Sequence, residues 1–142
     1  MSKKPSDANS PSPLERLVFF VDRSLGRKVI PIALRQAGED VRIHDDFFPQ
    51  NAEDPVWLTE AGKRGWVVLT KDVRIRYRAI ETNALLTAKV RAFVLTAKGD
   101  LSGQEMADIF IKALPAIKRL CAKVPPPFIA RVSRESSVAL IP

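Results

Sequence analysis

Leu17-Val-Phe-Phe-Val-Asp22 is the stretch that decides the fold class of this chain. Its apolar residues form an unbroken β-prone run, which is typical of a strand buried on both faces of a parallel sheet. Helical patterns separate it from three further strand-sized segments. The predicted later strands are Val41–His44, Trp66–Thr70 and Arg91–Leu95. Strands that alternate with helices predict βαβ units, so we expect a single α/β domain with a central parallel sheet.

Start and stop signals place the first two helices. The pattern over Leu25–Ala37 ends at Gly38, and Pro31 inside it indicates that this helix either begins late or bends. A polar loop is expected after the second strand. Asp54 is then expected to be the N-cap of the second helix, with Pro55 as its first residue.

The two later helices differ in how clearly the sequence marks their starts. The basic stretch Lys71–Arg78 leads into a predicted helix over Ile80–Ala88. Ser102 with Glu105 three residues later is a capping-box pattern that opens the last helix. Pro115 is expected to kink or split that last helix.

The two ends of the chain differ from its centre. Residues 1–14 contain almost no apolar side chains, so we expect a disordered tail. Residues 15–122 form the predicted domain, and residues 123–142 form a proline-rich segment with a hairpin. In that hairpin Phe128–Val132 pairs with Val138–Ile141, either as an appended edge of the sheet or as a partner-binding element. No fifth parallel strand is expected.

Composition narrows the chemistry. The chain has 142 residues, enough for one domain, and its hydrophobic fraction of 46% is sufficient for a core. No apolar run reaches the ~18 residues that a membrane span needs. The start resembles no secretory signal, so we expect a cytoplasmic protein without membrane contact. A single cysteine, Cys121, and a single histidine, His44, exclude internal disulfides and metal sites built from several histidines or thiolates.

Positive charge predicts a polyanionic partner. The net charge is +7 and the isoelectric point is about 9.9, which favours nucleic acid, although many small basic proteins carry such charge only for solubility. The basic residues expected to contact phosphate surround the strand ends. They are Arg23, Lys71, Arg74, Arg76 and Arg78.

Aspartates follow three successive predicted strands. Asp22 follows the first strand, Asp45 and Asp46 follow the second, and Asp72 follows the third. Ligands of open parallel sheets bind beyond the carboxyl ends of the strands, so these side chains are expected at one edge, with Asp54 near it. Carboxylates gathered in this way repel one another unless a cation balances them, and oxygen ligands suit Mg²⁺ or Mn²⁺.

Structural roles are the alternative for each of these residues. Asp22 and Asp54 are also suitable helix caps, and Asp45 and Asp46 suit a solvated turn. His44 is better interpreted as a strand or loop residue than as a general base. The basic run Lys71–Arg78 is equally typical of a solvated helix start.

Three short motifs occur in a familiar order. They are Phe20-Val-Asp22-Arg-Ser-Leu-Gly26, Val41-Arg-Ile-His-Asp-Asp-Phe47 and Trp66-Val-Val-Leu-Thr-Lys-Asp72. Over about residues 17–120 the chain resembles the PIN-like domains, in particular their VapC-type branch. The resemblance implies a Rossmann-like α/β/α sandwich and cleavage of RNA that depends on Mg²⁺ or Mn²⁺. It also implies a toxin held inactive by a cognate antitoxin protein.

The resemblance also implies roles for the aspartates. Asp22, Asp46 and Asp72 match the metal ligands, with Asp46 a better match than Asp45. Asp54 matches an acid at the start of the following helix. It would be a fourth catalytic residue, which either binds the metal or orients the attacking water. Arg74 departs from the pattern, because related domains commonly carry another aspartate there. A one-ion site, or substitution by Asp45 or Glu81, is compatible with this departure.

Other functions remain open at the level of sequence. Arg74 favours a non-catalytic module that binds nucleic acid or a partner and keeps an incomplete metal site. A phosphorylated receiver domain also gathers aspartates, but it normally has an acidic pair after its first strand, where this chain has only Asp22. A homodimer is an open option, and the RNA target is not determined.

Overall fold

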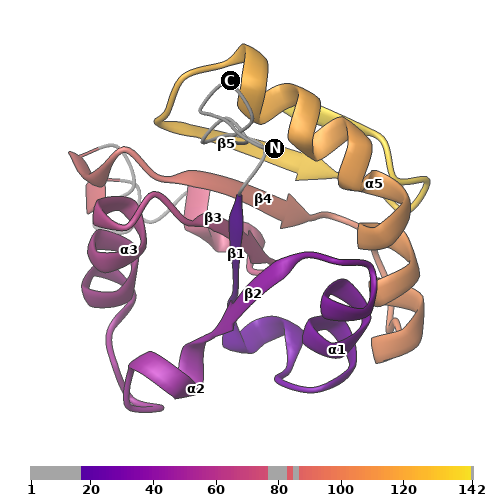
Figure 1. Ribbon diagram of the computed structural model, residues 1–142, viewed down its shortest axis with the longest axis horizontal. Helices are drawn as coiled ribbons and strands as arrows, with labels where there is room; N and C mark the ends of the chain where they lie inside the picture. Colours follow the sequence, from indigo (N-terminus) through magenta and orange to yellow (C-terminus); the bar gives the residue numbers. More distant parts are fainter. Residues whose placement is uncertain (1–16, 77–82, 85–86, 142) are drawn as a thin grey trace, which may run out of the picture.

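A six-stranded sheet forms the centre of the molecule (Figure 1). The structure is a computed structural model that describes residues 17–76, 83–84 and 87–141. The strands lie in the order β2-β1-β3-β4-β5-β6. Neighbouring strands from β2 to β5 are parallel, and β6 is antiparallel to β5. The bounds are β1 Val18–Val21, β2 Asp40–Ile43, β3 Val67–Thr70, β4 Arg91–Leu95, β5 Phe128–Val132 and β6 Val138–Leu140.

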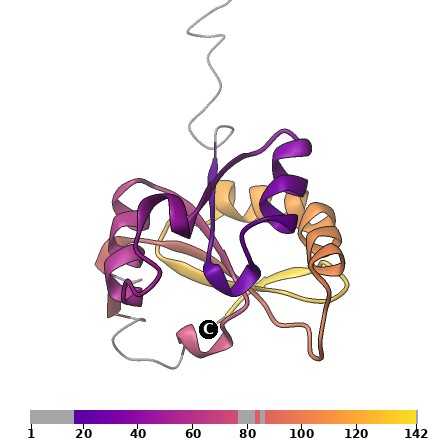
Figure 2. The same ribbon diagram turned by 90° about the horizontal axis from the view of Figure 1, so that it is seen from below.

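Helices cover both faces of this sheet. They are α1 Val29–Gln36, α2 His44–Phe47, α3 Asp54–Lys63 and α5 Gly103–Lys123, with two 3₁₀ turns, η2 Arg23–Leu25 and η3 Val73–Arg76. In Figures 1 and 2, α1 and α5 lie on one side of the sheet and α3 lies on the other. The expected α/β/α sandwich is therefore confirmed.

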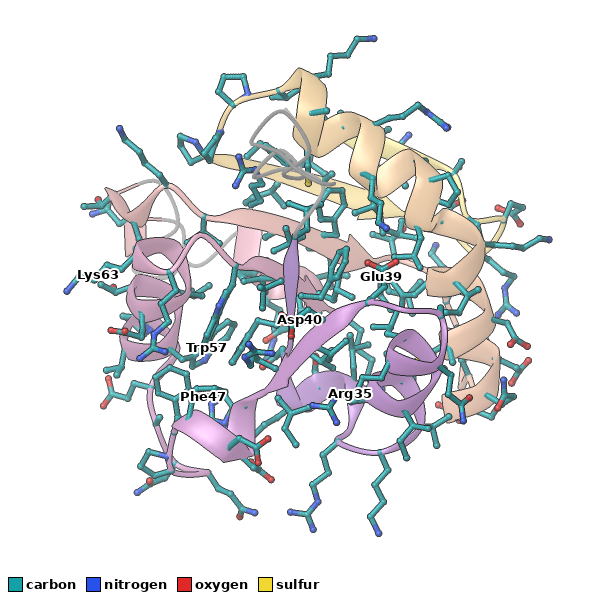
Figure 3. All side chains as sticks on the ribbon, viewed as in Figure 1. Arg35, Glu39, Asp40, Phe47, Trp57 and Lys63 are labelled. Carbon is teal, nitrogen blue, oxygen red and sulfur yellow. The ribbon has the colours of Figure 1, made fainter. Side chains whose placement is uncertain are left out.

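Adjacent residues of the strands pack into two separate hydrophobic cores. Phe19 packs in the core beneath α1 and α5, whereas Phe20 packs in the core beneath α3. Both side chains are fully buried. Phe20 stacks on Trp57 and Trp66 at ring-centroid distances of 5.4 and 5.3 Å, and Figure 3 shows Trp57 between α3 and the sheet. Burial of each such side chain contributes about 1.5–3 kcal/mol, which explains why an unbroken apolar run forms this strand.

The first and last helices show how the sequence signals act. Helix α1 begins late, at Val29, so Pro31 falls in its first turn, where a missing N–H costs little. The capping box of Ser102 and Glu105 is present at the start of α5. Of the two effects expected of Pro115, a split is excluded, because α5 continues through it, and a kink stays a prediction. Pro115 lies on the exposed face, so water can reach the carbonyl group that loses its helical partner.

Two boundary predictions beside the candidate site need correction. Strand β2 ends at Ile43, so His44 and the two aspartates after it belong to α2 and not to a strand and loop. Glu53 occupies the N-cap of α3, and Asp54 and Pro55 are its first two residues. Each shift is one residue, because the local signals mark a turn more sharply than the exact residue at which it starts.

The C-terminal hairpin is confirmed, and its first strand extends the central sheet. Strand β5 pairs in parallel with β4, so it is the fifth parallel strand that the sequence interpretation missed. Strand β6 then forms the edge. The predicted tail over residues 1–14 and most of the predicted helix at 80–88 lie outside the described residues. No described helix is long and apolar enough to cross a membrane.

Candidate active site

Buried polar side chains concentrate at one edge of the sheet. Among the described residues, the buried polar or charged ones are Asp22, His44 and Thr70. They follow or end the neighbouring strands β1, β2 and β3, at the carboxyl ends of these strands. Burial of polar groups costs free energy unless they are hydrogen-bonded, so this concentration indicates a site and not an accident of packing.

Asp22 is placed directly by strand pairing. Its backbone N–H donates to the Leu69 carbonyl at 3.0 Å, so the residue continues the contact between β1 and β3. Asp22 occupies the N-cap position of η2, but its side chain makes no capping hydrogen bond. The interpretation of Asp22 as a helix cap is therefore wrong, and its carboxylate is available for another role.

Two hydroxyl groups hold this carboxylate. Oδ2 of Asp22 accepts hydrogen bonds from Ser24 Oγ at 2.7 Å and from Thr70 Oγ1 at 2.8 Å. The two hydroxyl oxygens lie 3.0 Å apart because they share this acceptor. The Lys71 N–H donates to Ser24 Oγ, and the Asp72 N–H donates to Thr70 Oγ1, each at 3.1 Å. The network therefore fixes the backbone after β3 relative to Asp22.

Asp72 is the second carboxylate residue that this network positions, through the bond from its N–H to Thr70. Its side chain is 22% exposed and pairs with the Arg74 guanidinium, whose Nε donates to Oδ1 at 3.0 Å and whose second nitrogen donates to Oδ2 at 3.3 Å. The Arg74 backbone N–H also donates to Oδ1 at 3.1 Å. Arg74 is mostly exposed, and exposed ion pairs contribute only about 0–1 kcal/mol. Such a pair can rearrange when a stronger ligand of Asp72 arrives.

His44 is a buried aromatic neighbour of the site and not an exposed base. Its ring lies 5.5 Å from Phe48 and 6.1 Å from Trp57 between centroids. Neither ring nitrogen has a hydrogen-bond partner among the described residues. Burial lowers the pKa of His44, and the charge of Arg23 lowers it further, whereas Asp22 and Asp45 oppose the shift. The imidazole is therefore neutral at pH 7.

Asp45 and Asp46 face different surroundings, although they are adjacent on α2. Asp45 accepts a hydrogen bond from Arg27 at 2.9 Å, and that bond lowers the pKa of its carboxyl group. Its other oxygen is buried without a hydrogen bond, 3.7 Å from Nδ1 of His44. Asp46 is exposed, and its side chain has no hydrogen bond or ion pair within the described part of the chain. Its predicted role as a ligand stays a prediction.

Four predicted site residues lie partly or wholly outside the described residues. Asp54 begins α3 and Arg76 ends η3, but the side chains of both lie outside the described part of the structure. Arg78 and Glu81 lie wholly outside it. Of the predicted ligands, the structure joins Asp22 and Asp72 through one hydrogen-bonded network, and within the described residues no hydrogen bond joins Asp46 to it.

The donor set fits a hard divalent cation in part. Oδ1 of Asp22 accepts no hydrogen bond among the described residues, so it keeps lone pairs for a ligand, and the Asp72 carboxylate is partly exposed. Mg²⁺ commonly binds through one or two carboxylates and retains several waters. Among the described side chains, no three acidic, histidine or cysteine residues are grouped as a complete protein cage. Water and substrate oxygens would therefore complete the coordination.

Basic hollows flank the loop that follows β1. One, of about 400 Å³, is lined by Ser24, Lys28 and Lys71 with parts of α1 and α5. The other, of about 340 Å³, is lined by Arg23, Arg27 and Asp45 with Gly26 and Gln50. Lys71 and Arg23 are predicted phosphate contacts, and both are exposed here. Positive charge beside a carboxylate centre is the arrangement that a phosphodiester substrate needs.

Sequence reasoning missed four residues of this site. Ser24 and Thr70 escaped notice because a hydroxyl group carries no distinctive pattern until its partner is known. Arg27 and Lys28 do carry a signal in the sequence, since adjacent cations after a predicted strand-end turn are suitable phosphate ligands.

Comparison with known proteins tests the resemblance carried by the three motifs. The model of a family described as "PIN like domain" matches residues 17–97. A protein of Mycobacterium tuberculosis (strain ATCC 25618 / H37Rv) named "Putative ribonuclease VapC45" is 32% identical over 127 residues, which cover 87% of this chain and 91% of that protein. No solved structure matches the chain with significance. The resemblance seen in the three strand-end motifs is thus confirmed, and the chain belongs to the PIN-like domain family.

Proposed function

We propose that this protein is an endoribonuclease that hydrolyses RNA phosphodiester bonds with Mg²⁺ or Mn²⁺. The observation that supports this most strongly is the buried Asp22 carboxylate, held by two hydroxyl groups at the carboxyl edge of the sheet. The related protein named as a ribonuclease is the second support. Oδ1 of Asp22 accepts no hydrogen bond from the described residues, so it can bind a cation.

Asp22 and Asp72 are the residues that we assign to hold the cation, with Asp46 as the third ligand. When bound, such a cation stabilises charge on a phosphoryl oxygen and lowers the pKa of water. Ser24 and Thr70 hold one oxygen of Asp22, so that its other oxygen has a fixed direction. We retain Asp54 as the residue that orients the attacking water.

Cationic side chains act on the substrate in this proposal. Arg23 and Lys71 are exposed beside the acidic centre and grip the phosphate groups on either side of the scissile bond. Arg27 is already paired with Asp45, so it orients that carboxylate and adds positive potential. These charges offset the negative charge that develops on the phosphoryl oxygens. Neutral, enclosed His44 takes no proton from the substrate.

The experiment compares cleavage of a set of RNA oligonucleotides by wild type and by Asp22→Asn, Asp72→Asn and Asp46→Asn, with Mn²⁺, Mg²⁺ or EDTA. Asp40→Asn is the matched control, because Asp40 is exposed at the start of β2, at the opposite edge of the sheet from the candidate site. We expect at least 100-fold slower cleavage for Asp22→Asn and Asp72→Asn and no change for the control. Denaturation midpoints show whether each variant folds. Wild-type rates in the folded Asp22→Asn protein would refute the assignment.

A non-catalytic module that binds RNA or a partner is the second candidate. The observation that favours it is the Arg74 guanidinium, which occupies both oxygens of Asp72. This candidate predicts RNA binding without cleavage under any metal condition. Manganese titration by calorimetry separates the two, because the nuclease binds Mn²⁺ and Arg74→Ala should bind it more tightly.

The biological role that we propose is that of a toxin neutralised by a cognate antitoxin protein. Expression of the wild-type chain in a bacterial host should arrest growth, and expression of the Asp22→Asn variant should not. Rescue by the product of a neighbouring gene would identify the antitoxin. Normal growth with abundant active wild-type protein would contradict this role.

A further inference from the structure

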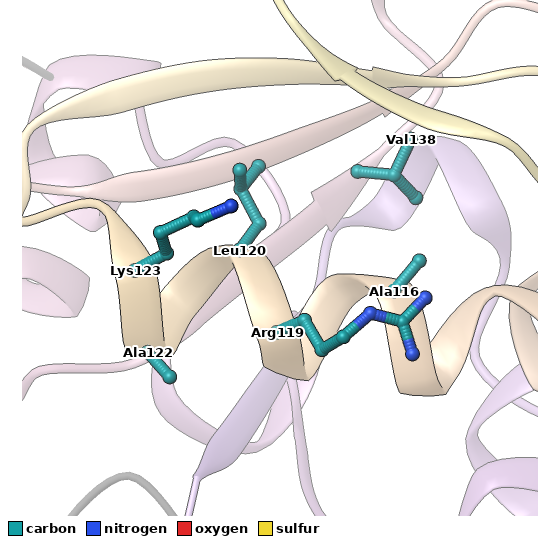
Figure 4. Close-up of a pocket in the computed structure, with 6 residues that line it drawn as sticks. All are labelled: Ala116, Arg119, Leu120, Ala122, Lys123 and Val138. Atoms are coloured by element: carbon teal, nitrogen blue, oxygen red, sulfur yellow. The ribbon is translucent and has the colours of Figure 1, made fainter.

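A second hollow site lies far along the chain from the aspartates, between α5 and the edge of the sheet. Ala116, Arg119, Leu120, Ala122, Lys123 and Val138 line a groove of about 520 Å³. Figure 4 shows the side chain of Val138 directed from β6 toward α5, with Leu120 and Ala116 on the facing side and the two cations beside them. The groove therefore has an apolar floor and a positively charged rim.

The adjoining strand presents unpaired backbone at its outer side. Ile141 donates its N–H to the Ile129 carbonyl at 2.8 Å, and Ser133 donates its N–H to the Ser137 carbonyl at 3.0 Å. Antiparallel ladders alternate between residues that bond inward and residues that face outward. The N–H and C=O groups of Val138 and Leu140 therefore face away from β5. Within the described residues, no strand pairs with that side of β6.

Side chains of the same two residues mark the face that an added strand would cover. Val138 and Leu140 are two residues apart, so they lie on one face of β6. Leu140 is 43% exposed, which is unusual for a leucine on the inner face of a sheet. A strand that pairs with β6 would place alternate side chains over this apolar face, which is how extended peptides extend a sheet.

From the groove, the strand edge and the two cations, we infer that this surface binds an extended acidic peptide of a partner protein as an additional strand. Arg119 and Lys123 select carboxylate side chains, and the arginine can pair with one through two hydrogen bonds. On the face of the peptide that turns toward α5, apolar residues fill the space between Leu120 and Val138, and acidic residues reach the two cations. The inference does not depend on the proposed nuclease function.

Charge argues against two other occupants. Two copies joined through β6 around an axis perpendicular to the sheet would bring Arg119 and Lys123 of each copy toward those of the other, and like charges repel. Residues 1–16 of this chain carry three basic and two acidic side chains, so they do not supply an acidic strand. A partner of opposite charge complements both the groove and the net charge of +7.

The test uses a fluorescein-labelled peptide in which every second residue is threonine and the positions between are valine or glutamate, so that valines and glutamates share one face of a strand. It is titrated with the full chain and followed by anisotropy. We expect wild type to bind it and the Arg119→Glu/Lys123→Glu variant to bind at least 10-fold more weakly. The same variant should gain affinity for the peptide in which lysine replaces glutamate. The matched control is Lys63→Glu/Lys112→Glu, an equal charge change at exposed lysines outside the groove, Lys63 lying at the end of α3 (Figure 3).

Two further measurements test the strand geometry. Leu140→Pro removes an outward N–H without removing a bond to β5, so it should weaken peptide binding at least 10-fold. Peptide should also slow amide exchange of Val138 and Leu140. If Leu140→Pro fails to fold, the charge variant and the exchange rates still decide the question.

Three experimental results would overturn this inference. Equal binding of the acidic peptide by wild type and the charge variant would do so. Displacement of the peptide by a short RNA, with that RNA losing affinity in the same variant, would assign the groove to nucleic acid. A wild-type dimer that Leu140→Pro dissociates would assign it to a second copy. Asp22→Asn should bind the peptide as wild type does, so failure of the nuclease proposal leaves this test intact.

Discussion

Replacement of Thr70 by valine tests whether the hydroxyl network organises the candidate site. Valine has nearly the same shape, so the change removes a hydroxyl group from a residue that is 1% exposed and creates no cavity. The variant loses the bond from Thr70 to the Asp22 carboxylate and the bond from the Asp72 N–H to Thr70. Hydrogen bonds to charged groups contribute about 1.5–3 kcal/mol, and ordinary ones contribute about 0.5–1.5 kcal/mol.

The expected loss of stability is therefore about 2–4 kcal/mol. Guanidinium denaturation followed by circular dichroism measures it as a lower midpoint at an unchanged slope. Thr96→Val is the matched control, because Thr96 makes one long bond of 3.4 Å to the Val132 carbonyl and should lose less than about 1 kcal/mol. Thr70→Ser keeps the hydroxyl group and should lose only about 1 kcal/mol for the missing methyl group.

The serine variant also separates positioning from stability. If the network orients Asp22, RNA cleavage falls in Thr70→Val and recovers in Thr70→Ser. Equal denaturation midpoints for Thr70→Val and Thr96→Val would refute the energetic reasoning. Equal cleavage by the valine and serine variants would refute the positioning role.

Three other changes probe the rest of the fold. The pKa of His44 is lowered in the folded state, so the neutral imidazole makes its full contribution to protein stability above pH 6.5, the ordinary value. That contribution is lost as the pH falls through the lower pKa of the folded state. Stability should therefore drop toward pH 5 in wild type more than in His44→Phe, and an NMR titration midpoint of 6.5 or higher would contradict this. Burial raises the pKa of Cys121 to about 11, so unfolding releases the thiol proton once the pH exceeds the ordinary value. The free energy of unfolding of wild type should therefore fall by about 1 kcal/mol relative to that of Cys121→Ala between pH 9 and 10. Parallel curves of stability against pH for the two proteins would contradict this. Gly62→Ala should destabilise the protein by about 1–3 kcal/mol, because its Cβ would meet the Ala88 carbonyl, and a higher unfolding temperature would show that this contact relaxes.

Much of the architecture was predictable because it depends on local patterns. Unbroken apolar runs predict buried strands, and alternating helices make those strands parallel, so Asp22 and Asp72 had to lie at one edge. The capping box at Ser102 needs only contacts within one turn and was predicted from its spacing. These inferences required no knowledge of distant neighbours.

The tertiary structure decided what depends on distant neighbours. Ser24 and Thr70 meet at Asp22 although 46 residues separate them, and neither residue alone indicates a network. Strand β5 joins β4 because α5 carries the chain back across the sheet. The proline-rich segment before β5 hides this pairing at the level of sequence. The end of β2 at Ile43 turns Asp45 toward Arg27 and leaves Asp46 exposed. Sequence alone therefore determined which residues reach the edge, and only the packing of the whole chain determined which way their side chains point, because contacts such as that of Arg27 with Asp45 join residues far apart in the sequence.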